Sequence, residues 1–80
     1  MSLKNIYLTA KKNLPDTILL FEVGGFYEAI EADAIIVSDI LGTTKTTHNG
    51  VMITGFSCFN LEKNIIKIVR AGHKTGIINK

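Results

Sequence analysis

The segment Thr17–Val23 constrains the fold more than any other part of the chain. It reads Thr-Ile-Leu-Leu-Phe-Glu-Val, so apolar residues occupy both of its alternating faces. Because successive side chains of a strand point to opposite faces, such a strand needs an apolar layer on each side. Thr17–Val23 is therefore predicted to be a central strand of a sheet that is covered on both faces.

The chain before this strand has the spacing of a helix. Its apolar stripe consists of Leu3, Tyr7, Ala10 and Leu14, and Pro15-Asp16 ends it. After the strand, Gly24-Gly25 suits a tight hairpin turn into a second strand, Phe26–Ile30. The carboxylates of Glu31 and Asp33 then favour the first turn of a second helix through its dipole. The stripe of this helix consists of Ile30, Ala34, Val37 and Leu41, with Gly42 at its end.

The second half of the chain repeats the pattern of hairpin and helix. Asn49-Gly50 is a strong hairpin signal between the polar segment Thr43–His48 and a strand, Val51–Thr54. Asn60 is predicted to cap a third helix, and Lys74–Asn79 to form a last strand. The inward residues of this helix are expected to be Leu61, Ile65, Ile68 and Val69, with Gly72 at its end.

These elements predict one domain over residues 1–80, because 80 residues are too few for two. The fold class is α/β of the α+β type, with a single mixed sheet, about three flanking helices and the order α-ββ-α-ββ-α-β. Met1–Leu3 has the form of a cloning remnant and is given no functional weight. No leader and no apolar run long enough for a bilayer is found, so a cytoplasmic chain with no membrane partner is expected.

Composition argues against several functions. The lone Cys58 has no partner for a disulfide or a zinc cluster, and His48 and His73 stand in no catalytic motif. Neither phosphate-loop pattern, GxxxxGK[ST] or GxGxxG, is present. The net charge of +2 permits an anionic partner but is low for a non-specific nucleic-acid binder. No enzyme activity, catalytic residue, metal or cofactor is therefore expected.

The most informative stretch is Val23–Glu28, where strand alternation places Phe26 and Glu28 on one face. An aromatic ring there can insert between DNA bases, and the carboxylate can accept a hydrogen bond from a base edge. The alternative is that Phe26 belongs to the core and Glu28 is a solvated carboxylate. The spacing alone does not decide between them.

This stretch resembles the Gly-x-Phe-x-Glu segment of the N-terminal mismatch-recognition domain of the MutS family of DNA mismatch repair proteins. The resemblance extends from about Ile6 to Lys80. Other segments in the order of that family are Tyr7-Leu8, Lys11-Lys12, Leu19–Phe21, Asp33-Ala34, Gly55, Gly72–Lys74 and Gly76–Ile78.

The resemblance implies a mixed α/β domain that binds double-stranded DNA carrying a mismatch or an unpaired base. Phe26 would be the wedge that enters from the minor groove, and Glu28 would bond to the displaced base. Candidates for contacts to the DNA backbone are Lys45, Thr46 and Thr47, with Lys11 and Lys12 as further ones. ATP would be bound only by other domains of the family, and a second copy or those domains would be further partners.

Departures from the family pattern keep other functions open. Glu22 and Gly25 stand where many members have a basic and an acidic residue, and Ile53–Ser57 lacks the usual proline. An interaction or self-association module is the alternative, using a strand edge or the Val51–Phe59 segment. Its anchors would be Phe56 and Phe59.

A third alternative is a carboxylate-dependent nuclease that uses Glu28 or Asp33 as a metal ligand. Glu31 and Asp33 are already explained as residues of a helix start, which weakens this interpretation. The basic residues of the third helix, Lys63, Lys67 and Arg70, are interpreted as a solvated face.

Overall fold

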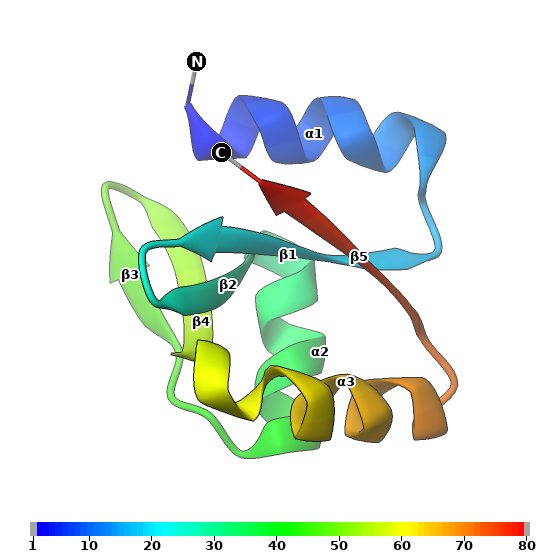
Figure 1. Cartoon of the computed structure of the whole chain (residues 1–80). Coiled ribbons are helices and arrows are strands. Elements are labelled where there is room, and N and C mark those ends of the chain that lie inside the picture. Colours follow the sequence, from blue (N-terminus) through cyan, green and yellow to red (C-terminus); the bar gives the residue numbers. More distant parts are fainter. Residues whose placement is uncertain (1, 80) are drawn as a thin grey trace.

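The computed structural model describes residues 2–79 and confirms the predicted order of elements (Figure 1). A short 3₁₀ helix, η1, is the one addition within this range. The elements are α1 (Leu3–Asn13), β1 (Thr17–Val23), β2 (Phe26–Ile30), α2 (Glu31–Leu41), β3 (Thr46–His48), β4 (Val51–Ser57), η1 (Cys58–Asn60), α3 (Leu61–Arg70) and β5 (Lys74–Asn79).

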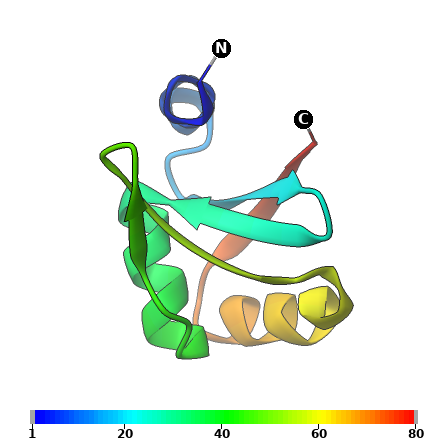
Figure 2. The ribbon, with the colours of Figure 1, turned by 90° about the vertical axis from the view of Figure 1, so that its left-hand side faces the viewer.

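The strands form one mixed sheet in the order β3-β4-β2-β1-β5. β1 is parallel to β5, and the other neighbours are antiparallel. Figure 2 shows α1 on one side of this sheet and α2 and α3 on the other. The prediction of a strand covered on both faces is confirmed, because the first five residues of β1 are all buried.

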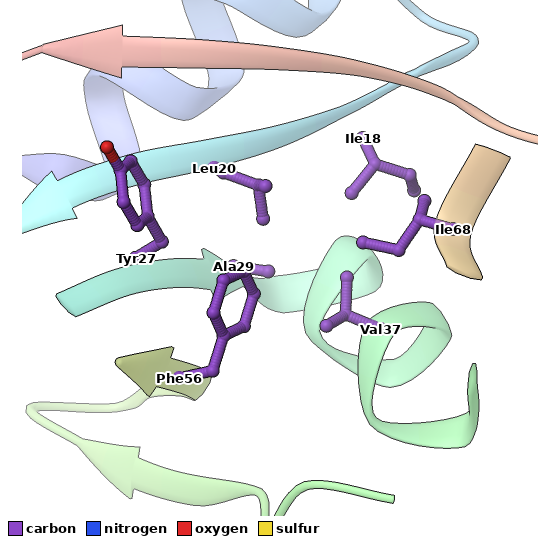
Figure 3. Close-up of a cluster of buried hydrophobic side chains, with 7 residues drawn as sticks. All are labelled: Ile18, Leu20, Tyr27, Ala29, Val37, Phe56 and Ile68. Carbon is purple, nitrogen blue, oxygen red and sulfur yellow. The ribbon is translucent and has the colours of Figure 1, made fainter. Parts of the chain in front are cut away.

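The alternating side chains of β1 supply two core clusters, one on each face of the sheet. The cluster under α2 and α3 consists of Ile18, Leu20, Tyr27, Ala29, Val37, Phe56 and Ile68 (Figure 3). The cluster under α1 consists of Tyr7, Leu19, Phe21 and Ile30. Ser2 and Leu3 help to fix the start of α1. The Ser2 hydroxyl caps the helix by accepting a hydrogen bond from the Asn5 amide at 3.2 Å, and Leu3 packs against the cluster under α1.

Several local predictions are wrong in detail. Leu14 follows the last helical residue and is exposed, because α1 already ends at Asn13. Val69 is also exposed, since it lies about 100° around α3 from the buried Ile68. Asn60 precedes α3 but makes no capping bond with its side chain, because η1 leads directly into the helix. The strand predicted over Val51–Thr54 continues to Ser57.

The second hairpin forms as its sequence predicts. Asn49 and Gly50 both have positive φ, 51° and 77°, which is the backbone that a two-residue turn of type I′ requires. β3 and β4 pair on either side of this turn. The hairpin places β3 at the edge of the sheet.

Asp33 lies in the first turn of α2, as predicted, and also has a structural role that the sequence did not show. It is buried, and its Oδ1 accepts from Lys11 Nζ at 3.1 Å. Its Oδ2 accepts from the Leu19 amide at 3.1 Å, while Lys11 Nζ also donates to the Thr17 carbonyl at 2.7 Å. The Asp33–Lys11 pair therefore ties α1, β1 and α2 together, and the Lys11 ammonium is not free for a DNA phosphate.

Candidate nucleic-acid interface

Phe26 begins β2 directly after the β1–β2 turn. It lies between Val23 of β1 and Ser57 of β4 in the strand register. Its side chain is 56% exposed, whereas Tyr27 and Ala29 on the opposite face of the strand are buried. Phe26 therefore belongs to neither core cluster, and its ring is presented to solvent from a strand that is paired on both sides.

Glu28 lies on the same face as Phe26 and is half-buried, opposite Phe21 of β1 and Gly55 of β4. The side chain of Glu28 occupies the space above Gly55. A Cβ atom at residue 55 would lie 3.3 Å from Glu28 Cγ and 3.0 Å from the backbone oxygen of Tyr27. Gly55 thus makes room for Glu28, which the sequence analysis missed although a glycine inside a strand signals close approach.

Two carboxylates lie near Phe26, one on each face of the sheet. Glu28 shares the face of Phe26, whereas Glu22 is exposed at the end of β1 and pairs with Tyr27, so it points to the other face. Burial, followed by the negative charge of Glu22, raises the pKa of the Tyr27 phenol above its ordinary value of 10.0. Negative charge at this end of the sheet opposes contact with phosphates.

The η1 helix is fastened to the turn that precedes Phe26. The Cys58 amide donates to the Gly25 carbonyl at 2.9 Å. Phe59 follows, and its side chain is 94% exposed. Phe56 has a different environment, because its ring is buried and stacked on Tyr27 at 6.1 Å between centroids. The prediction that Phe56 anchors a partner is therefore wrong, whereas Phe59 has the exposure that an anchor needs.

The structure does not bring Lys45, Thr46 and Thr47 close to Phe26. All three are exposed, on β3 or directly before it. Thr46 pairs with Ile53, four residues along β4 from the partner of Phe26, and β3 is two strands away from β2. Standard strand spacings give a separation of about 16 Å. Thr46 shares the sheet face of Phe26, and Thr47 points to the other face.

Two further features lie outside this end of the sheet. A cavity of about 360 Å³ opens between the start of α1 and the β3–β4 hairpin, with Lys4 and His48 among its lining residues. Lys12 is exposed in the last turn of α1. Neither feature adjoins the β1–β2 turn.

The described residues contain no cluster of metal-ligating side chains and no helix suited to crossing a membrane. Within residues 2–79, no three His, Cys, Asp or Glu side chains gather as a metal site would require. No helix in this part of the chain is long and apolar enough to cross a membrane. Asp33 has both carboxylate oxygens engaged by Lys11 and Leu19, so it does not fit the ligand role that the nuclease alternative gave it.

Comparison with known proteins assigns the fold to a family. The family model described as MutS domain I matches residues 2–80. The chain belongs to the MutS domain I family. Proteins named DNA mismatch repair protein MutS match it with 43% identity in Porphyromonas gingivalis, 40% in Parabacteroides distasonis and 38% in Thermotoga maritima. Each match covers 92% of this chain, and the chain spans only 9% of the length of each relative.

Proposed function

We propose that this MutS domain I binds double-stranded DNA at a mismatched or unpaired base, with Phe26 as the inserting side chain. The observation that carries the proposal is the 56% exposure of Phe26 at the end of a strand whose next residue is buried. The names of the relatives support DNA as the partner, since they are DNA mismatch repair proteins.

The physical basis is the deformability of damaged DNA. Inserting an aromatic ring between base pairs costs the stacking energy of that step, and a mispaired step has less stacking to lose. Phe26 is suited to this insertion because β1 and β4 flank it, so the ring acts from a rigid frame. Selectivity then comes from the weakness of the DNA at the lesion and needs no sequence readout.

Glu28 would accept a hydrogen bond from the displaced base on the same face. Glu28 lies on the same face of β2 as Phe26, and its side chain fits over Gly55 because that residue has no Cβ atom. A carboxylate near the groove also repels phosphates, so intact duplex gains little from this end of the sheet. Phe26 and Glu28 together would favour discrimination over affinity.

Backbone contacts would come from the β3 edge. At about 16 Å from the wedge, Lys45 and Thr46 would reach a phosphate about five base-pair steps from the lesion. Thr47 would contribute only from the other face of the hairpin. In this role the chain is not catalytic and uses no cofactor of its own. A second copy, or other regions of a longer mismatch-repair protein, would strengthen binding through avidity.

The test is fluorescence anisotropy with three labelled duplexes, carrying a G·T mismatch, one unpaired T or perfect pairing. Titrations at low and physiological salt compare the chain with Phe26→Ala, and Phe59→Ala is the control for loss of an exposed aromatic ring. The proposal predicts preference for the two defective duplexes, lost in Phe26→Ala and kept in Phe59→Ala. Equal affinity for all three duplexes in the unaltered chain would refute it.

A further inference from the structure

The outward side of α3 carries an unusual mixture of exposed residues. We call it the outer α3 surface and define it as Phe59, Lys63, Ile66, Lys67, Val69 and Arg70. All six are exposed, and Phe59 stands in η1 directly before the helix. The opposite side of α3 packs against the core through Ile68, with Leu61 and Ile65 beside it. The outer α3 surface is thus not needed to hold the helix on the sheet.

Three of these residues are apolar. Phe59 is 94% exposed, Val69 52% and Ile66 45%. Ile66 and Val69 are neighbours at i and i+3 on the helix. Single exposed apolar residues are common on proteins, but three on one short element amount to a patch that gains free energy when it is covered.

The other three residues are cations. Lys63, Lys67 and Arg70 follow one another at i, i+4 and i+7, and within residues 2–79 none of them forms an ion pair. Glu62 is the one acidic residue of α3, so three positive charges and one negative charge leave +2 on the helix. This equals the formal net charge of the whole chain, +2. The rest of the chain therefore has a formal net charge of zero, and the excess positive charge of the protein lies on this helix.

We propose that the outer α3 surface docks an acidic, amphipathic protein segment. Carboxylates of the segment would pair with Lys63, Lys67 and Arg70, and its apolar side chains would cover Phe59, Ile66 and Val69. Charge complementarity selects this partner over a second copy of the chain, because two α3 helices with a net charge of +2 each repel one another.

The same surface is a poor match for DNA. Phosphates would neutralise the cations, but they give Ile66 and Val69 no apolar cover. The position of α3 points the same way, because it packs on the sheet face that carries Tyr27 and Ala29. Phe26 and Glu28 lie on the opposite face. The α3 residues of the docking surface therefore lie on the other side of the sheet from the proposed DNA site, whereas Phe59 in η1 is close in the chain to Ser57, the strand partner of Phe26.

The test is a titration of the ¹⁵N-labelled chain with three synthetic helical peptides, followed by amide chemical shifts. The first peptide has a Leu stripe at i, i+3, i+4 and i+7 with Glu at its other positions. The second replaces its Glu by Lys, and the third replaces its Leu by Ser. The proposal predicts binding of the Leu/Glu peptide alone, with shifts confined to residues 59–70.

Variants separate the two parts of the surface. Lys63→Glu/Lys67→Glu/Arg70→Glu should lose at least about tenfold in affinity for the Leu/Glu peptide and gain affinity for the Leu/Lys peptide. Ile66→Ser/Val69→Ser should lose about tenfold with its charges unchanged, and Lys12→Glu on α1 should change nothing. Phe26→Ala should bind the peptide normally, which keeps this test independent of DNA recognition.

Three results would overturn the proposal. The first is an affinity for the Leu/Glu peptide that survives the triple charge reversal. The second is equal binding of the Ser-substituted peptide, which would reduce the surface to a patch of charge. The third is displacement of the peptide by a fully paired duplex, which would make α3 a phosphate-binding surface.

Discussion

Asp33 and Glu28 carry the same chemical group only five residues apart in the chain, yet their surroundings are opposite. Asp33 is 2% exposed, and both of its oxygens accept hydrogen bonds from other elements. Glu28 is half-buried above Gly55, beside an exposed aromatic ring. The Asp33 carboxylate joins α1, β1 and α2, whereas the Glu28 carboxylate remains available to a ligand.

The comparison shows how an 80-residue domain divides its residues between stability and binding. A domain of this size has a free energy of unfolding of only about 5–15 kcal/mol, so it needs internal bonds such as the Asp33–Lys11 pair. Glu28, beside the β1–β2 turn, is not used in such an ion pair within residues 2–79. Substitution of Asp33 should therefore lower the free energy of unfolding, whereas substitution of Glu28 should change DNA binding.

Asp33→Asn should have the largest effect on stability. The partly buried Lys11 ammonium would lose its counterion, so the free energy of unfolding should fall by about 3 kcal/mol. Urea denaturation measures the change, and Asp39→Asn on the exposed side of the same helix is the matched control. A loss below about 1 kcal/mol in Asp33→Asn would show that the pair does not hold the elements together.

Gly55→Ala should affect both stability and binding. The new Cβ would lie 3.0 Å from the backbone oxygen of Tyr27, so β2 and β4 must move apart slightly at a cost of about 1–3 kcal/mol. Glu28 would be displaced as well, and the preference for mismatched DNA should fall. Gly25→Ala is the control, since nothing lies within 4 Å of a Cβ there. Equal effects of the two substitutions in urea denaturation and anisotropy would contradict the role of Gly55.

Tyr7→Phe should change the dependence of stability on pH. Burial, and then the negative charge of Asp33, raise the pKa of the Tyr7 phenol above 10.0. The folded chain thus favours the neutral phenol. The contribution of neutral Tyr7 to the free energy of unfolding is therefore complete below pH 10 and is lost as pH rises through the pKa of the folded chain. Urea midpoints from about pH 8 to about pH 11 should fall less steeply in Tyr7→Phe. Parallel curves for the two proteins would show that Tyr7 does not contribute.

Glu28→Gln should have the smallest effect on stability, within about 0.5 kcal/mol, because the side chain is only half-buried. Its effect should appear in binding. Loss of a charged acceptor should lower the preference for a mismatch by about tenfold, while affinity for paired DNA rises slightly as repulsion is removed. Anisotropy with matched and mismatched duplexes separates the two changes. An unaltered preference would remove Glu28 from the proposed site.

The sequence predicted most of the fold because its elements are marked locally. The apolar faces of Thr17–Val23 and the Asn49-Gly50 turn both depend on neighbouring residues, and both are confirmed. The MutS resemblance is confirmed in the same way, by matches spread along the chain.

Burial of single residues was harder to predict. Glu31 and Asp33 both suit a helix start, and nothing local shows that Asp33 would turn inward to Lys11 and Leu19. Phe56 and Phe59 were considered together, yet one is buried and the other almost fully exposed. Phe56 is buried because β4 continues past Thr54 and its alternation places the ring against Tyr27, whereas Phe59 lies beyond the strand in η1. The roles of Phe26 and Glu28 in DNA binding stay predictions.

The most direct test of the division is the free energy of unfolding of Phe26→Ala by urea denaturation, beside Phe56→Ala. If Phe26 is free of the core, its loss should change stability by less than about 1 kcal/mol, whereas loss of the buried Phe56 ring should cost about 3–5 kcal/mol. A similar loss of about 3 kcal/mol or more in Phe26→Ala would contradict the account, because Phe26 would then be a core residue and not a side chain kept for DNA.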